Sequence, residues 1–319
     1  MQVVDVLILD DDAEFYRAAL AKEPIGTRLH VAISEAEALK LCAEAEILVA
    51  MAHRVTPRLI AAMPRLKFIQ ALTTGTDHLA TLNLPADIAI ASMRGMHGPQ
   101  MAEMAFLYML ALSRDAARMQ AQQRAKAWVR WPQPLLIQKT LVIVGVGAIS
   151  QALATRAKVF GMRVVGVSDA RSEVADFDEI MPRSALAVAA AQADFLVVLA
   201  PLTQATLSMI DAGVFAAMKQ GVIFINLARG PVVNEAALVE SLRSGHLGAA
   251  GLDVFEIEPL PANSPLWDLP EVMITPHIGG MSDIYAQQAL PILAENLRAW
   301  QTAGVKGLRN LVEVKGDAS

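Results

Sequence analysis

Three observations predict an α/β protein with two domains. The chain has 319 residues, whereas an ordinary domain holds about 100 to 200 residues. Short apolar runs recur along the chain, separated by more polar or helical intervals. Continuously apolar runs are typical of strands buried on both faces, as in a parallel sheet covered by helices. A glycine-rich turn also joins a predicted strand to a predicted helix near the middle of the chain.

The first part of the chain predicts one α/β unit that extends to about residue 98. Apolar runs bounded by turn residues are its expected strands, and the intervals between them are expected to be helices and loops. These runs are VVDVLIL (3–9), AEILVA (45–50), LKFIQAL (66–72) and IAIASM (88–93).

Gly98-Pro99 precedes a long helical pattern from Gln100 to about Arg124, with the proline where a first turn tolerates it. This helix is apolar over most of its circumference before Arg114. A helix without a clear polar face usually packs on two sides, so we expect a subunit interface and a homodimer here. Trp128 and Trp131 follow, either as anchors of that interface, which is favoured, or as a cover for the active site.

A second α/β series fills the rest of the chain and predicts a doubly wound sheet. Its expected strands are TLVIVG (140–145), RVVGVS (163–168), FLVVLA (195–200), VIFINLA (222–228), GAAGLDV (248–254) and VMITP (272–276). One more helix is expected from Ser282 to Thr302.

Composition excludes several classes of protein. The chain is 54% hydrophobic and 18% charged with a net charge of −5, which makes a nucleic acid an improbable partner. The apolar helical stretches are interrupted by charges too early to cross a membrane. The single cysteine, Cys42, and an acidic start without a secretory pattern favour the cytoplasm. No Cys/His spacing suggests zinc, and Asp10–Asp12 is expected to be a solvated turn, so no metal site is predicted.

The glycine-rich turn nearly matches a dinucleotide fingerprint. Gly145 and Gly147 fit G-x-G-x-x-G between a strand and a helix, but Ser150 replaces the third glycine. The third glycine serves the close packing of helix on strand and not the binding of phosphate. Its replacement by serine therefore leaves the phosphate-binding N–H groups in place. We expect the helix to sit slightly farther from the sheet.

The end of the next strand carries the residues that distinguish NAD from NADP. Asp169 would bind the adenosine ribose hydroxyls and favour NAD, whereas Ser168 with Arg171 would accommodate a 2′-phosphate and favour NADP. The sequence leaves both cofactors open.

Five stretches closely resemble the D-isomer-specific 2-hydroxyacid dehydrogenases over nearly the whole chain. They are VGVGAIS (144–150), PLTQAT (201–206), NLARGPVVNEAALVESLRSGHL (226–247), GAAGLDVFEIEPLP (248–261) and LPEVMITPHIGG (269–280). The resemblance implies a Rossmann-type nucleotide domain inserted in a flavodoxin-like substrate domain. The substrate domain would be residues 1–98 plus 288–319, and the NAD(P)-binding domain residues 99–287.

The same resemblance assigns the site residues. Arg229 matches the substrate-binding arginine, His277 the acid/base, and Glu258 the carboxylate that is paired with His277. In the first domain, the N–H groups of Thr74 and Gly75 are expected to face the substrate carboxylate. The cofactor-binding set comprises Gly145, Gly147, Ala148, Ile149, Ser168, Asp169, Arg171, Pro201, Thr206, Ala228, Asp253, His277 and Gly279, with Asp253 near the nicotinamide.

These residue types suit the reduction of a 2-oxo acid. Hydride reaches the carbonyl carbon while a proton reaches its oxygen, and imidazole is the side chain that exchanges protons near neutral pH. Arginine offers a planar fork for the carboxylate. The predicted function is hydride transfer between NAD(P)H and a small 2-oxo acid or D-2-hydroxy acid; the alternative is a dinucleotide-sensing binding protein resembling a corepressor. His53, His78 and His97 are expected to be structural or peripheral, although His97 precedes the inter-domain crossing.

Overall fold

The computed structural model describes residues 3–312 and divides the chain into two compact units. Unit 1 combines Met1–Met96 with Ser282–Ser319, and unit 2 is His97–Met281. The last helix, α11 (Tyr285–Ala303), lies entirely in unit 1, where Ala286, Ala289 and Ile292 join the apolar core. Residues 1–2 and 313–319, which the sequence analysis assigned to the substrate domain, lie outside the described residues.

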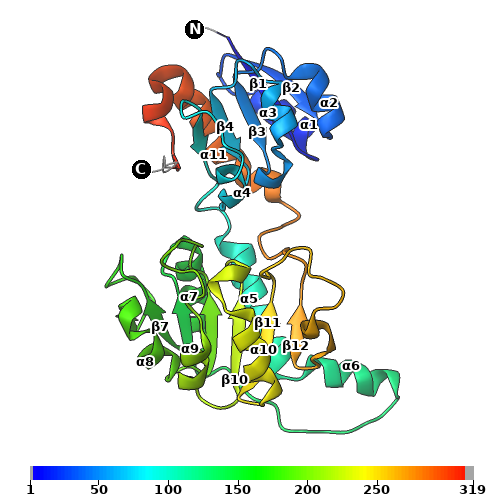
Figure 1. Ribbon diagram of the computed structural model, residues 1–319, viewed down its shortest axis with the longest axis vertical. Helices are drawn as coiled ribbons and strands as arrows, with labels where there is room; N and C mark the ends of the chain where they lie inside the picture. Colours follow the sequence, from blue (N-terminus) through cyan, green and yellow to red (C-terminus); the bar gives the residue numbers. More distant parts are fainter. Residues whose placement is uncertain (1–2, 313–319) are drawn as a thin grey trace. The chain divides into compact units, whose positions relative to one another are not determined.

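Unit 1 is a parallel five-stranded sheet in the order β2-β1-β3-β4-β5 (Figure 1). Alternate residues of its strands enter two apolar cores, one shared with α1 and α11 and the other with α2, α3 and α4. This strand order is that of flavodoxin-like folds. The strands are β1 (Val4–Leu9), β2 (Thr27–Ala32), β3 (Ile47–Ala50), β4 (Phe68–Ala71) and β5 (Ala89–Ala91). The other helices are α1 (Ala13–Leu20), α2 (Glu35–Leu41), α3 (Pro57–Ala61) and α4 (Asp77–Ala80), with short 3-10 turns η1 (Ala52–Arg54) and η5 (Gly304–Gly307).

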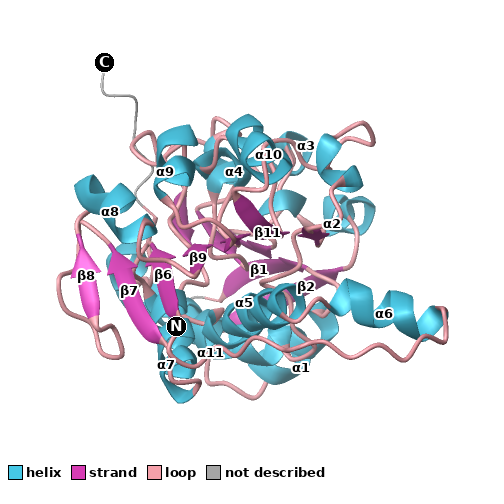
Figure 2. Cartoon of the chain, turned by 90° about the horizontal axis from the view of Figure 1, so that it is seen from below, coloured by secondary structure: helices cyan, strands magenta, loops and turns pink. Residues whose placement is uncertain are grey.

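Unit 2 is a parallel seven-stranded sheet in the order β12-β11-β10-β9-β6-β7-β8. Two apolar cores flank it, one shared with α5 and α7 and the other with α8, α9 and α10 (Figure 2). The strands are β6 (Thr140–Val144), β7 (Arg163–Val167), β8 (Glu179–Met181), β9 (Phe195–Val198), β10 (Val222–Asn226), β11 (Leu247–Leu252) and β12 (Val272–Ile274). The helices are α5 (Gly98–Ser113), α6 (Ala116–Arg124), α7 (Ala148–Val159), α8 (Leu186–Ala190), α9 (Ala212–Ala217) and α10 (Glu235–Arg243), with 3-10 turns η2 (Arg183–Ala185), η3 (Gly230–Val232) and η4 (Pro265–Asp268).

The chain reverses strand order after β8, when β9 pairs on the other side of β6. A ligand of an open α/β sheet binds outside the carboxyl ends of the strands at such a reversal. The predicted fold class, a Rossmann-type sheet together with a flavodoxin-like one, is therefore confirmed.

The predicted single helix from Gln100 to Arg124 is wrong. Helix α5 ends at Ser113, and Asp115 adopts a left-handed backbone with φ of 57°. The Asp115 side chain then accepts a hydrogen bond from Arg118 N–H and starts α6 as a separate helix.

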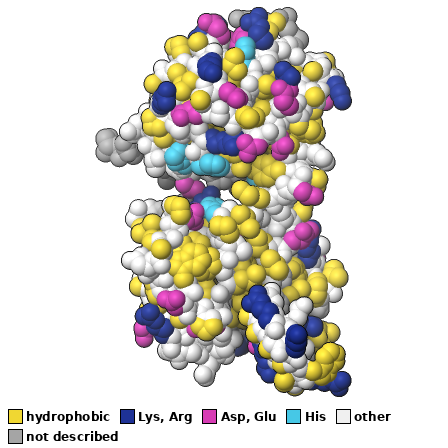
Figure 3. Space-filling view, turned by 90° about the vertical axis from the view of Figure 1, so that its right-hand side faces the viewer, with side chains coloured by type: hydrophobic (Ala, Val, Ile, Leu, Met, Phe, Trp, Pro, Cys, Tyr) yellow, Lys and Arg dark blue, Asp and Glu magenta, His cyan; other side chains and the backbone are white. Residues whose placement is uncertain are grey.

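Helix α6 projects from the body of unit 2 (Figure 1) and has no buried residue. Figure 3 shows hydrophobic and basic side chains next to each other at the lower end of the face that it draws. Trp128 is 87% exposed, and the Arg118 guanidinium lies 4.3 Å from the centre of the Trp131 ring. Within the described part of the chain, no helix is long and apolar enough to cross a membrane.

Candidate active site

The glycine turn after β6 is shaped by two different constraints. Gly145 has φ of 95°, and a Cβ there would lie 2.6 Å from the backbone of Ala200. Gly147 meets nothing within 4 Å and precedes the first residue of α7. The turn therefore needs Gly145 for its bend, while Gly147 leaves open space at the helix N-terminus, where backbone N–H groups bind phosphate.

Ser150 strengthens this turn. Its side chain is buried, and its hydroxyl donates a hydrogen bond of 2.5 Å to the carbonyl of Gly145. The serine thus ties α7 to the turn. Helix α7 lies close to α5 at Gly98, where a Cβ would be 3.0 Å from the Cβ of Ala152 in α7.

Asp169, just beyond β7, is held by Arg183 of η2. Its Oδ1 accepts from Arg183 N–H at 2.8 Å, and its Oδ2 lies 3.0 Å from Arg183 Nη2. Arg183 Nη1 donates to the carbonyl of Ala205, which links this edge to the 201–206 loop. Ser168 Oγ accepts from Ala170 N–H, and Arg171 is exposed. Arg183 was not among the predicted residues, because a loop and the strand β8 separate it from Asp169 in the sequence.

Thr206 shapes the loop that Pro201 begins. The Thr206 hydroxyl donates to the carbonyl of Pro201 at 2.7 Å and accepts from Thr203 N–H at 2.8 Å. The side chain is buried, so its visible role is to fix this loop beyond β9.

The Arg229 turn is fixed by Asn226 at the end of β10. Asn226 Oδ1 accepts from Ala228 N–H, and its Nδ2 donates to the Arg229 carbonyl at 3.1 Å. A Cβ on Gly230 would lie 1.8 Å from the carbonyl carbon of Phe255. The Arg229 turn therefore packs directly against the segment that carries Glu258, and only glycine fits at that contact.

Glu258 and His277 form a hydrogen-bonded pair. His277 Nδ1 lies 2.7 Å from Glu258 Oε2, while Phe255 N–H donates to Oε1 at 3.0 Å. Burial by itself raises the pKa of Glu258, but the hydrogen bonds from His277 and Phe255 lower it. The charges of His277 and Arg229 act in the same direction, and the pKa ends below its ordinary value. Glu258 is therefore ionised at neutral pH, and its stabilising contribution is lost only as the pH falls through that lowered pKa.

Asp253 fastens the loop that presents His277. Its side chain is 1% exposed and its carboxylate accepts hydrogen bonds from Thr275 Oγ1, Ile278 N–H and Gly279 N–H. A Cβ on Gly279 would lie 2.8 Å from Asp253 Oδ2, which explains glycine there.

The remaining predicted residues divide between the units. Thr74 and Gly75 lie in unit 1 between β4 and α4, where Thr73 Oγ1 donates to the Gly75 carbonyl at 2.6 Å. His78 interacts through its ring with the carbonyl of Val55, and His53 lies in η1. His97, the first residue of unit 2, is buried beside Gly280.

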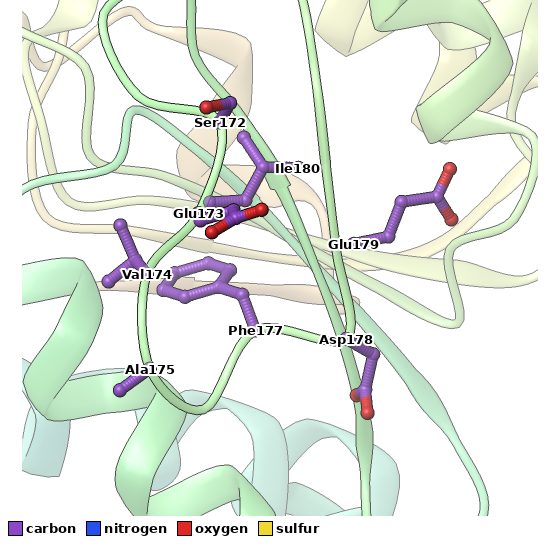
Figure 4. Close-up of a pocket in the computed structure, with 8 residues that line it drawn as sticks. All are labelled: Ser172, Glu173, Val174, Ala175, Phe177, Asp178, Glu179 and Ile180. Atoms are coloured by element: carbon purple, nitrogen blue, oxygen red, sulfur yellow. The ribbon is translucent and has the colours of Figure 1, made fainter.

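A cavity of about 310 Å³ is formed by the loop that joins β7 to β8 and by the first residues of β8, and none of these predicted residues lines it. It is lined by residues 172–175 and 177–180. In Figure 4 the ring of Phe177 lies next to Val174, while the carboxylates of Asp178 and Glu179 point away from them. Among the described residues, no group of three or more His, Cys, Asp or Glu side chains is arranged to hold a metal ion.

The doubly wound sheet and the glycine turn are features of a dinucleotide-binding domain, and the His–Glu pair is an arrangement suited to acid/base chemistry. A family profile described as "D-isomer specific 2-hydroxyacid dehydrogenase, NAD binding domain" matches residues 106–279. The chain belongs to the D-isomer specific 2-hydroxyacid dehydrogenase family, as its sequence motifs indicate.

Curated relatives agree with this family. D-3-phosphoglycerate dehydrogenase of Mycobacterium leprae is 35% identical over 93% of this chain, and the match spans 57% of that relative's length. Glyoxylate/hydroxypyruvate reductase B of Citrobacter koseri is 36% identical, with 74% of this chain and 75% of the relative covered.

Solved structures are similar over almost the full chain. A family member from Aeromonas salmonicida has a TM-score of 0.89 and 36% identity, with 98% of this chain and 99% of that chain covered. An NADPH-dependent glyoxylate/hydroxypyruvate reductase from Sinorhizobium meliloti, in complex with NADP and sulfate, has a TM-score of 0.83 and 28% identity, with 98% of each chain covered.

Proposed function

We propose that this protein transfers hydride between a nicotinamide cofactor and C2 of a small 2-oxo acid or D-2-hydroxy acid. The observation that carries the proposal is the His277–Glu258 pair at 2.7 Å, together with the Arg229 turn packed through Gly230 onto the Glu258 segment. Family membership supports it.

The residues at the turn fit a dinucleotide. Gly147 leaves open space before α7, and Gly145 and Ser150 hold the turn in shape. We assign the pyrophosphate to this turn, where the helix N-terminus favours an anion. A nicotinamide dinucleotide held at this turn would supply or accept the hydride.

In the proposed mechanism each side chain has a distinct task. Arg229 binds the substrate carboxylate and polarises the adjacent carbonyl. Glu258 occupies His277 Nδ1, so Nε2 is the nitrogen that gives a proton to the carbonyl oxygen during reduction and takes it back during oxidation. The hydrogen bond between Glu258 and Nδ1 also fixes the orientation of the imidazole ring. We also assign the substrate carboxylate to the N–H groups of Thr74 and Gly75, in a turn fixed by the Thr73 hydroxyl.

A substrate panel tests this proposal. Glyoxylate, hydroxypyruvate, pyruvate and bulkier 2-oxo acids are assayed with NADH and with NADPH, and turnover of at least one small acid is expected. Cofactor binding without turnover across the panel would contradict the proposal and favour a dinucleotide-sensing protein.

We propose further that Asp169 makes NADH the preferred cofactor. A 2′-phosphate would meet the Asp169 carboxylate, which Arg183 holds through both of its oxygens. In Asp169→Ser the repulsive charge is gone and Arg183 is released to pair with phosphate. The ratio of kcat/KM for NADH to that for NADPH should therefore fall about tenfold or more.

The control for this prediction is Glu173→Gln, which removes one negative charge from the neighbouring loop that lines the 172–180 cavity. Its cofactor ratio should match that of the wild type. An unchanged ratio in Asp169→Ser, or a wild type that already prefers NADPH, would disprove the role of Asp169.

The proposal also covers the oligomeric state of the protein and its location in the cell. We infer a homodimer formed through α5, α6 and the segment with Trp128, because exposed tryptophan next to an unburied helix is typical of an interface. A monomer in sedimentation at micromolar concentration would refute it. We infer a cytoplasmic location from the buried unpaired Cys42, which fractionation of cells that express the protein would test.

A further inference from the structure

A chain of hydrogen bonds runs from helix α5 to the loop that carries His277. Tyr108 is fully buried in α5, and its hydroxyl lies 2.5 Å from Thr275 Oγ1. Thr275 Oγ1 is in turn 2.5 Å from Asp253 Oδ1. The Asp253 carboxylate accepts from the N–H groups of Ile278 and Gly279 at 2.9 and 2.8 Å. His277 lies between these anchored positions.

The direction of each hydrogen bond in this chain is determined by chemistry. The carboxyl oxygens of Asp253 accept from two backbone N–H groups, and the single proton of the Thr275 hydroxyl also goes to Asp253. Tyr108 must then donate to Thr275. Burial raises the pKa of Tyr108 well above its ordinary value, which keeps the phenol protonated as a donor. Thr275 Oγ1 therefore accepts one hydrogen bond, from Tyr108, and donates one, to Asp253.

The packing around Tyr108 shows that the ring is fitted to this position. A Cβ on Gly251 of β11 would lie 2.5 Å from the Tyr108 ring, so the glycine leaves room for it. Helix α5 contacts the same loop again at its first turn, where Gln100 Nε2 donates to the Gly280 carbonyl at 3.3 Å. Helix α5 therefore holds both ends of the His277 loop.

His277 needs such support because its backbone is in an unfavourable conformation. Its φ is 54°, a left-handed value that costs free energy for a residue other than glycine. Its N–H donates to the carbonyls of Asp253 and Thr275. A movement of Asp253 or of Thr275 would therefore change the orientation of the His277 imidazole.

We propose that Tyr108 is a positioning residue, which fixes His277 through Thr275 and Asp253 in the orientation needed for proton transfer. The proposal rests on the function proposed for His277 and extends it to a residue of α5 that is linked to the His277 loop through Thr275 and Asp253. Small misplacements of a reacting group can lower a rate by about 10²-fold. A single lost hydroxyl, with the ring retained, should have a smaller effect.

The kinetic test is a double-mutant cycle of Tyr108→Phe and Thr275→Val. Each single variant should lower kcat about tenfold, with the Kd of NADH changed by less than about twofold, because the link serves orientation. The double variant should be no worse than the more severe single one. Thr275→Ser, which keeps the hydroxyl, should restore most of the rate. Unchanged kcat in Tyr108→Phe, or effects that multiply in the double variant, would overturn the proposal.

Tyr16→Phe is the matched control. Tyr16 is also fully buried, but it lies in α1 of unit 1 and its hydroxyl has no hydrogen-bond partner within the described residues. Removing this hydroxyl should leave kcat unchanged. Equal losses in Tyr16→Phe and Tyr108→Phe would show a general effect of losing a buried phenol and would overturn the proposal.

Amide hydrogen exchange gives a readout that does not depend on turnover. In Tyr108→Phe and in Thr275→Val, the amides of Ile278 and Gly279 should exchange about tenfold faster, while those of β9 stay protected. If the wild type proves inactive on every substrate, the proposed function fails but this measurement still decides the role of Tyr108. Unchanged protection of both amides would contradict it.

Discussion

Replacement of His277 by alanine is expected to lower kcat about 10²- to 10⁴-fold, the usual contribution of a positioned acid/base. The ring nitrogen Nδ1 is held by Glu258 at 2.7 Å, and the side chain is 46% exposed, so Nε2 is accessible to a substrate. Alanine removes this proton donor and leaves the glycine turn untouched. Cofactor affinity should therefore persist.

Steady-state kinetics and NADH binding measured on the same preparations check this result. His246→Ala is the control, because His246 also lies in unit 2 but interacts through its ring with the Phe215 carbonyl. It should keep kcat near the wild-type value. Near-normal turnover in His277→Ala would remove His277 from the acid/base role.

Gly230→Ala is expected to lower both stability and activity, because it changes a backbone contact that supports the site. The added Cβ would lie 1.8 Å from the carbonyl carbon of Phe255 and 2.3 Å from the nitrogen of Glu256. These are backbone atoms that cannot rotate away, so the Arg229 turn and the Glu258 segment must separate. Overpacking of this kind costs about 1–3 kcal/mol or more of unfolding free energy, and kcat/KM should fall by at least about 10²-fold.

Chemical denaturation and kcat/KM test this prediction together. Gly213→Ala in α9 is the matched control, because the nearest atom to its new Cβ is a side-chain oxygen of Asp211 at 3.3 Å. Its unfolding free energy and activity should stay close to those of the wild type. A Gly230→Ala protein with wild-type stability would contradict the close contact between the two segments.

Most strands that could be predicted from the sequence are buried on both faces, although the edge strand β12 was also predicted from its apolar run. β6 and β10 are continuous apolar runs because helices cover both sides of the sheet. β2 and β8 gave no such signal, because these partly exposed edge strands carry charged residues and are not continuous apolar runs. The break between α5 and α6 was missed because it depends on the left-handed conformation of Asp115.

The predicted site residues are those that a motif marks. Gly145, Arg229, Glu258 and His277 each stand in a recognisable stretch, and the structure places Glu258 and His277 in contact. Arg183 and Tyr108 carry no local signal, because they act through tertiary hydrogen bonds to residues far away in the sequence. The hydrogen bond from Ser150 to Gly145 could not be predicted from the sequence, because it depends on the three-dimensional shape of the turn.

Deuterium transfer tests the central claim most directly. The protein is incubated with NADH that carries deuterium at both C4 positions of the nicotinamide and with the 2-oxo acid that gives the highest kcat/KM in the substrate panel. If hydride moves to C2 with His277 as the proton donor, the product is a 2-hydroxy acid with deuterium at C2 and, where C2 is a stereocentre, the D configuration. A product without deuterium at C2, an L product, or no product would contradict the account.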